Sequence, residues 1–405
     1  MQFNPRITRR AAGLGLLGTA LTLRGGTARQ GVSPFGEATP VGTSAEGGWR
    51  IADVMALDLD GIACALSPDG QWVAGIGPDR ELGIWSVPDL EPTLIPVEEA
   101  IEADSIAWAP DSSAVAFSVE AFLRGTDGDI FVYELGDDAV RNLTDDGFEG
   151  GFIGSGAPTT PIPIDVMPVW TPDSAAIVFA RSIWDSEAES VPTAIVRVGR
   201  DGGEAETLMS VDARPFSIFT PMMALDDGSI LYTFAFADVD DPMNGLWKLD
   251  PDGTTTQLMA GTGNDPFPTP ILLDAGLVDD ELSILGVSGA LLGTGNSSQP
   301  WLFQWTSSTG EAEPVETDET LRPLSATWSP DGGTMLVIGR QLAGESGVAV
   351  ETIGPAAELT VLPEGAGGTG RGPRWAIPTW SATNTVLIPA IGSPPYLLTV
   401  EPVGT

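Results

Sequence analysis

The sequence lacks histidine altogether. This absence excludes a serine–histidine–aspartate triad, a cysteine–histidine pair, imidazole general bases, and zinc or iron bound through histidine. Cysteine is nearly absent too: Cys64 is the only one, so no internal disulfide can form. Because Cys64 lies in the apolar run from Ile62 to Leu66, we expect a buried hydrophobic side chain rather than a reactive thiol.

Positively charged residues are scarce, and Lys248 is the only lysine. Lysine and arginine together number 18, against 56 aspartates and glutamates, which gives a formal net charge of −38. A field of this sign repels nucleic acid and anionic lipid surfaces, so we expect neither as a partner. It attracts divalent cations and basic proteins. Solubility alone, for example in a salty habitat, would also explain the acidity, and the composition does not distinguish this explanation from a functional role.

Residues 1–30 are predicted to be an export signal and not part of the fold. Arg6, Arg9 and Arg10 precede Ala11–Leu23, an apolar run of 13 residues that is too short to span a bilayer. The paired arginines resemble a twin-arginine signal, although the usual Phe-Leu pair does not follow them. We therefore expect an extracellular or cell-envelope protein with no transmembrane helix in the mature chain. Residues 31–48, rich in small residues and proline, are predicted to be a flexible linker.

A turn motif recurs along the rest of the chain. Its most complete copy is Trp328-Ser329-Pro330-Asp331-Gly332, in which proline fixes φ, aspartate caps its own backbone and glycine takes a positive φ. The copies are anchored at positions 66, 108, 170, 224, 277, 328 and 380, which places a repeat at roughly every fifty residues. One hairpin per repeat and no helical pattern are typical of a β-propeller.

Each repeat contains four predicted strands, except the last. The last repeat lacks its fourth strand at the C-terminus, and an extra strand, Trp49–Met55, precedes the first repeat. Since closure of the ring removes exposed strand edges, this extra strand is expected to complete the last blade. We therefore predict an all-β fold, a seven-bladed β-propeller of four-stranded blades over residues 49–405.

The motif carries a resemblance to known propellers. Trp328-Ser329-Pro330-Asp331-Gly332 followed by an apolar strand resembles the WD-repeat-like units of TolB-type propellers and of the propellers in some oligopeptidases. The resemblance covers roughly residues 50–405. A true WD-repeat signature is absent, because no Gly-His can occur and Trp184-Asp185 is expected in a loop. The motif residues are structural, so the resemblance implies a fold and transfers no catalytic residue.

Long loops are predicted on one face of the propeller. The loops between second and third strands, and the crossovers from fourth strands to the next blade, share a face that we call the long-loop face. The long segments are Glu120–Gly128, Asp145–Ile164, Ser182–Thr193, Ala235–Asn244 and Ser288–Gln299. The other two sets of turns are short and form the short-turn face. Binding sites of propellers commonly lie on long loops.

Aromatic and charged residues on these loops are candidate ligand-binding residues. They are Phe122, Arg124, Phe148, Phe152, Arg181, Trp184, Asp185 and Phe236. Aromatic side chains with arginine are enriched at protein interfaces, although aromatic residues also anchor long loops to a fold. Asp238, Asp240 and Asp241 could hold calcium through oxygen ligands, but their spacing is not that of an EF-hand. Asp-rich loops in so acidic a chain are also commonly plain turns.

Three functions fit these observations. The first is an exported, monomeric, non-catalytic propeller that binds an envelope or extracellular protein, or another ligand, through the long-loop face. It has no catalytic residue and no cofactor. The alternative is a carboxylate- or calcium-dependent hydrolase or lyase on the same face. The third is a structural part of a larger envelope assembly.

Overall fold

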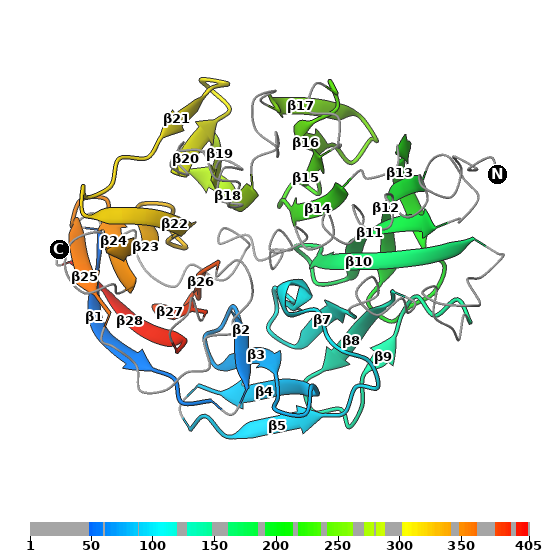
Figure 1. Cartoon of the computed structure of the whole chain (residues 1–405), viewed down its shortest axis with the longest axis horizontal. Helices are drawn as coiled ribbons and strands as arrows, with labels where there is room; N and C mark the ends of the chain where they lie inside the picture. The colour runs from blue at the N-terminus through cyan, green and yellow to red at the C-terminus, as the bar shows by residue number, and fades with distance from the viewer. Residues whose placement is uncertain are drawn as a thin grey trace, which may run out of the picture.

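The computed structural model describes residues 48–59, 61–87, 89–119, 128–147, 161–184, 191–213, 218–235, 241–261, 271–278, 281–287, 302–341, 348–362, 377–389 and 394–403. Their strands form seven four-stranded antiparallel sheets arranged in a ring (Figure 1). This confirms the predicted seven-bladed propeller. Over these ranges no helix has the length and apolar character needed to cross a membrane.

The blades follow one another along the chain. The first three comprise β2 (Ile62–Leu66), β3 (Trp72–Ile76), β4 (Leu82–Ser86) and β5 (Pro92–Ile95); β6 (Ala107–Trp108), β7 (Ala114–Ser118), β8 (Ile130–Glu134) and β9 (Arg141–Asn142); and β10 (Ile162–Trp170), β11 (Ala176–Trp184), β12 (Val191–Gly199) and β13 (Glu206–Ala213). A short 3-10 helix, η1 (Ala103–Ser105), leads into the second blade.

The remaining blades repeat the same order. The fourth and fifth comprise β14 (Ile218–Ala224), β15 (Ile230–Ala235), β16 (Gly245–Leu249) and β17 (Thr255–Ala260); and β18 (Ile271–Val278), β19 (Glu281–Val287), β20 (Leu302–Thr306) and β21 (Ala312–Pro314). The sixth and seventh comprise β22 (Leu321–Trp328), β23 (Met335–Gln341), β24 (Val348–Ile353) and β25 (Glu358–Val361); and β26 (Thr379–Trp380), β27 (Thr385–Ile388), β28 (Tyr396–Pro402) and β1 (Trp49–Ala56).

The first strand closes the ring as predicted. β1 pairs antiparallel with β28, from Trp49 opposite Pro402 to Ala56 opposite Tyr396. The Trp49 ring lies 6.0 Å from the ring of Trp380, edge to face, and so packs on the inner strand of its own blade. The last blade therefore contains both ends of the propeller chain, as the blue and red strands in Figure 1 show.

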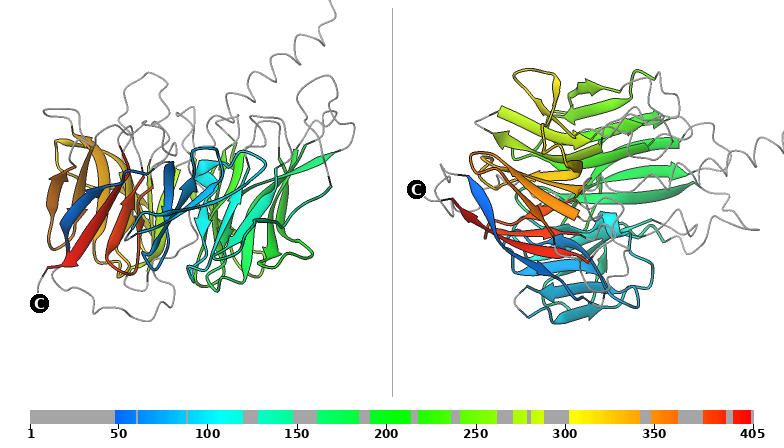
Figure 2. Two further views of the ribbon diagram at one scale, coloured as in Figure 1. Left: turned by 90° about the horizontal axis from the view of Figure 1, so that it is seen from below. Right: turned by 60° about the vertical axis from the view of Figure 1, so that its left-hand side comes forward.

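The strands run between two faces of the ring, as the left view of Figure 2 shows. The hydrophobic core lies between neighbouring blades. Trp170 and Phe179 of the third blade, for example, belong to one buried cluster with Ile130 and Val132 of the second. Cys64 packs against another such cluster, and burial raises the pKa of its thiol, in line with the expected unreactive side chain.

One strand is longer than expected. Trp184 is the last residue of β11 and lies opposite Ile162 of β10, so the expectation that Trp184 lies in a loop is wrong. The physical reason is the early start of β10, which is nine residues long and ends at the turn-anchoring Trp170, so its first residues extend the ladder outward. This extension carries Arg181 and its neighbours to the long-loop face.

The turns of the repeat are built on aspartate more than on glycine. Asp69, Asp111, Asp173, Asp227 and Asp331 each accept a hydrogen bond from the backbone amide two residues later. The residue after the aspartate has a positive φ, 70° at Gly332 but also 61° at Ser112 and 57° at Ser174. The aspartate caps therefore hold this conformation even where no glycine is present.

Candidate active site

Polar residues of the second and third blades meet on the long-loop face. In an antiparallel blade, the starts of the first and third strands and the ends of the second and fourth lie on this face. Asp165 lies near the start of β10 and Arg181 near the end of β11. Asp129 immediately precedes β8, and Thr144 follows β9. The four residues thus converge at one blade junction.

Asp165 and Arg181 form a bidentate ion pair. They lie opposite each other in the β10–β11 ladder. Arg181 Nε donates to Asp165 Oδ1 at 2.7 Å, and Arg181 Nη2 donates to Oδ2 at 2.6 Å. The Asp165 side chain is 1% exposed and that of Arg181 is 25% exposed, so the guanidinium bridges a buried carboxylate and the surface. Parallel bonds of this kind fix the orientation of the guanidinium.

Asp129 faces the same pair across the blade junction. Its carboxylate accepts from Thr144 Oγ1 at 3.1 Å and from Asn142 Nδ2 at 2.7 Å. Thr144 Oγ1 itself accepts from the Ile130 amide at 3.0 Å. The Asp165 backbone amide donates to the carbonyl of Gly128, the residue before Asp129, at 2.7 Å. This bond places Asp129 and Asp165 next to each other at the junction of the second and third blades.

The electrostatics agree with this geometry. Burial raises the pKa of Asp129, and the charges of Asp146 and Asp145 raise it further. Burial also raises the pKa of Asp165, and the nearby Asp129 charge adds to the effect, while the Arg181 hydrogen bonds oppose it. Two neighbouring carboxyl groups with raised pKa beside a fixed cation are the kind of cluster that acid–base catalysis uses.

Most residues predicted from the sequence lie elsewhere or cannot be placed. The predicted residues outside the described ranges are Phe122, Arg124, Phe148, Phe152, Asp185, Phe236, Asp238 and Asp240, and their roles stay predictions. Asp241 is buried, and its carboxylate accepts from the Met243 amide at 2.9 Å, as in a plain turn. Of the predicted residues that the structure describes, only Arg181 belongs to the cluster, with the Trp184 backbone three residues further along β11.

Asp129, Thr144 and Asp165 are not among the site residues predicted from the sequence. Asp165 is the only charged residue of β10, whose other residues are apolar or proline. A single carboxylate in an inner strand is costly unless it is paired, and this was the signal available in the sequence. Asp129 carried no such signal, because its acidic turn is one of many in the chain.

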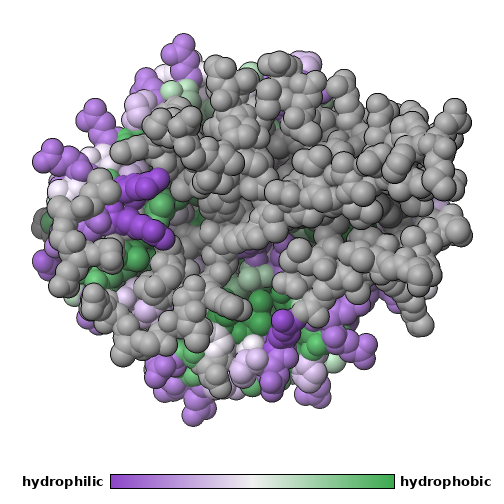
Figure 3. Space-filling model, in the orientation of Figure 1, coloured by the Kyte–Doolittle hydropathy of each residue, from purple (hydrophilic) through white to green (hydrophobic). Residues whose placement is uncertain are grey.

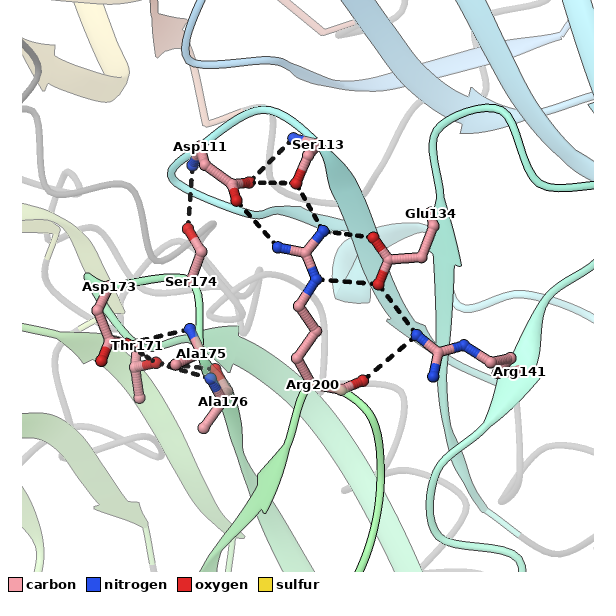
Figure 4. Close-up of polar contacts among 10 residues, drawn as sticks. All are labelled: Asp111, Ser113, Glu134, Arg141, Thr171, Asp173, Ser174, Ala175, Ala176 and Arg200. Carbon is pink, nitrogen blue, oxygen red and sulfur yellow. Dashed lines mark hydrogen bonds and ion pairs between the residues drawn. The ribbon is translucent and has the colours of Figure 1, made fainter.

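A second polar cluster lies between the same blades on the short-turn face (Figure 4). Arg200 donates from Nε to Glu134 Oε1 at 2.9 Å, from Nη1 to Asp111 Oδ2 at 2.9 Å and from Nη2 to Ser113 Oγ at 2.6 Å. Its guanidinium lies 5.5 Å from the centre of the Trp170 ring. The hydrogen bonds from Arg200 lower the pKa of Glu134. Every nitrogen of the guanidinium is engaged, so this cluster clamps two blades together.

In its fold, the chain is similar to two oligogalacturonate lyases of known structure. One, in complex with manganese, matches with a TM-score of 0.58 and 11% identity over 88% of this chain and 99% of the lyase. The other, from Vibrio parahaemolyticus, matches with a TM-score of 0.55 and 12% identity over 86% of this chain and 91% of the lyase. A prolyl endopeptidase matches with a TM-score of 0.48 and 14% identity over 79% of this chain and 43% of that protein. No protein-family model and no curated protein matches the sequence.

These structures correct the expectation of a non-catalytic binding protein. That expectation rested on the predicted export signal, the single repeat domain, the missing histidine and the aromatic residues of the long loops. The two lyases are enzymes, and the matches cover 99% and 91% of their chains, so a propeller of this kind needs no added domain to be an enzyme. The alternative of a carboxylate- or calcium-dependent hydrolase or lyase is favoured instead. The TolB-type resemblance is confirmed as far as the seven-bladed architecture.

One of the two similar lyases is in complex with manganese, so the residues of the Asp129–Asp165–Arg181 cluster are compared with the ligands that a metal needs. The chain has no histidine, so a metal would need carboxylate or other oxygen ligands. Within the described ranges, no three or more cysteine, aspartate or glutamate side chains are grouped so as to hold a metal ion. In the cluster itself, the Arg181 guanidinium already occupies both oxygens of Asp165. A metal therefore does not fit this site.

Proposed function

We propose that this protein is a lyase that cleaves an acidic oligosaccharide by β-elimination at the Asp129–Asp165–Arg181 cluster. The observation that carries the proposal is the pair of carboxyl groups with raised pKa beside a fixed guanidinium on the long-loop face. The oligogalacturonate lyases of the same fold suggest a uronic acid oligomer as the substrate class.

β-Elimination makes three demands on a protein. A base removes the proton on the carbon next to the sugar carboxylate, the glycosidic C–O bond breaks, and the departing oxygen gains a proton. A cation stabilises the charge that develops on the sugar carboxylate. A base is also most effective when its pKa lies near the working pH.

Asp129 and Arg181 suit the first and last of these tasks, Asp165 orients Arg181, and the departing oxygen takes its proton from water. Asp129 is half-buried with a raised pKa, which makes it a stronger base than an ordinary aspartate. Arg181 uses Nε and Nη2 for Asp165, and its Nη1 has no hydrogen bond to the described residues, so Nη1 can bind the sugar carboxylate. Asp165 is buried and holds the guanidinium in place, which makes it a positioning residue. No step of this scheme requires a metal.

The test is direct incubation of the purified protein with oligogalacturonate. A lyase produces a conjugated double bond, followed by ultraviolet absorbance, together with a new reducing end. We expect Asp129→Asn to lower kcat at least about a hundredfold, the usual size of a general-base contribution. The matched control is Asp252→Asn, because Asp252 is an exposed aspartate of a turn between β16 and β17. Reducing ends without the double bond would identify a hydrolase, and no cleavage of any acidic oligosaccharide would overturn the proposal.

We also propose that the enzyme acts outside the cytoplasm, since residues 1–30 have the features of an export signal.

Calcium bound by Asp238, Asp240 and Asp241 is a separate proposal, supported by the hard oxygen ligands that these carboxylates supply. If calcium acts there, EDTA lowers activity and added calcium restores it. Activity unchanged by EDTA would remove calcium from the scheme and leave the carboxylate mechanism intact.

A further inference from the structure

Two exposed arginines lie side by side on the sixth blade. Arg322, the second residue of β22, is directly opposite Arg340, the last but one of β23. Both side chains are exposed. Because β22 begins and β23 ends on the long-loop face, the pair lies on the face that also carries the Asp129–Asp165–Arg181 cluster. Figure 3 shows strongly hydrophilic side chains beside hydrophobic ones on the left of the view, where Figure 1 places the sixth blade.

This pairing is unfavourable for the fold alone. Like charges directly opposite each other on neighbouring strands destabilise a sheet. The chain has 56 acidic residues to pair with its 18 basic ones. Six of the seven other basic residues that the structure describes make ion pairs, Arg80 being the exception; the six are Arg50, Arg141, Arg181, Arg197, Arg200 and Lys248. Over the same described ranges, neither Arg322 nor Arg340 forms one.

The geometry of the pair suits a carboxylate. Side chains directly opposite in an antiparallel ladder have Cβ atoms about 5 Å apart, so two guanidinium groups can reach one anion between them. Arginine presents a planar set of donors that matches a carboxylate with two parallel hydrogen bonds. A bound anion would also cancel the repulsion between Arg322 and Arg340.

We propose that Arg322 and Arg340 form a subsite that binds the carboxylate of an acidic sugar unit distant from the bond that is cleaved. This inference rests on the proposed function for the identity of the ligand. The sixth blade lies across the ring from the third, which carries Arg181, as β22 and β10 show in Figure 1. Only an extended oligomer that crosses the centre of the ring can engage both places. The subsite therefore selects for chain length as well as for charge.

The experiment compares binding of hexagalacturonate with binding of its methyl ester, which has the same sugars without the charges. Calorimetry is done in the Asp129→Asn background, so that no cleavage occurs. We expect Arg322→Gln/Arg340→Gln to weaken binding of the acid at least about tenfold and to leave binding of the ester unchanged. The control, Arg50→Gln/Arg197→Gln, removes two exposed arginines as well and should match the parent protein.

Kinetics of the otherwise unmodified enzyme separate this inference from the proposed function. We expect Arg322→Gln/Arg340→Gln to raise KM for hexagalacturonate and to leave cleavage of the shortest substrate unchanged. If both double variants bind hexagalacturonate equally well, or if Arg322→Gln/Arg340→Gln weakens binding of the acid and of the ester equally, the subsite is rejected. Asp129-dependent cleavage would then still support the proposed function. Arginine-dependent binding without any cleavage would uphold the subsite and reject the lyase.

Discussion

At the scale of single residues, the raised pKa of Asp129 sets when the proposed base can act. A base works only when deprotonated, so activity should fall on the acid side at a higher pH than for an ordinary aspartate. Burial is the main cause, and the Asp146 charge contributes. Asp146→Asn removes that charge and lowers the pKa of Asp129. We expect the acid limb of kcat/KM against pH to move to lower pH, with the plateau retained.

The control for this prediction is a carboxylate far from the site. Asp252 lies in a turn between β16 and β17, and Asp252→Asn should leave the acid limb in place. An acid limb that stays fixed, or moves to higher pH, in Asp146→Asn would show that Asp129 is not the titrating base.

The arginine pair of the sixth blade makes a prediction about stability. Since Arg322 and Arg340 repel each other across the ladder, Arg340→Gln should raise the Tm by about 1–2 °C at low salt. The gain should shrink at high salt, where exposed charges are screened. Thermal unfolding at two salt concentrations measures both effects. A fall in Tm would mean that Arg340 has a stabilising partner.

At the scale of elements, neighbouring blades are joined through their turns. The Asp69 amide donates to Ser112 Oγ at 3.0 Å, and the Asp111 amide donates to Ser174 Oγ at 3.0 Å. At the last junction, the Ala382 amide donates to the Pro68 carbonyl at 2.8 Å. These bonds link the seventh, first, second and third blades on the short-turn face. They also explain why serine occupies a position where φ is positive: its hydroxyl accepts the bond from the preceding blade.

Two substitutions at Ser112 distinguish the contribution of its hydroxyl to stability from the cost of its backbone conformation. Ser112→Ala removes the acceptor and keeps the unfavourable φ of 61°, so we expect a loss of about 1 kcal/mol in unfolding free energy. Ser112→Gly removes the same acceptor but relieves the backbone, so its loss should be smaller. Denaturant unfolding compares the two. Equal stability of Ser112→Ala and the parent protein would show that the bond between the turns contributes nothing.

The elements show what a sequence can and cannot predict here. Aspartate-based turns are local, so their recurrence predicted seven blades, and the unpaired Trp49–Met55 segment predicted the closure of the ring. The active-site candidate depends instead on a contact between blades: Asp129 and Thr144 belong to the second blade, and they meet Asp165 of the third only after the two sheets have packed. Likewise, Arg200 and Glu134 are 66 positions apart. No local pattern indicates which of many carboxylates will meet in this way.

At the scale of the whole molecule, the charge of −38 opposes the approach of an acidic substrate. Added salt shortens the range of that repulsion, from about 30 Å at 0.01 M to about 8 Å at 0.15 M. We expect kcat/KM on oligogalacturonate to rise several-fold over this range, because association of like charges is slow at low salt. The methyl ester binds with little salt dependence and is the control. A fall in kcat/KM with salt would mean that local arginines outweigh the net charge.

The closure of the ring also orders events in time. β1 is among the first strands to leave the ribosome, yet its partner β28 is made last, and the ion pair between Arg50 and Glu401 spans 351 positions. Until β28 has been made, β1 has no native ladder, and the seventh blade cannot form. A chain truncated before β28 therefore leaves both ends of the propeller with open edges. The first strand of the ring waits for the last before the ring can close.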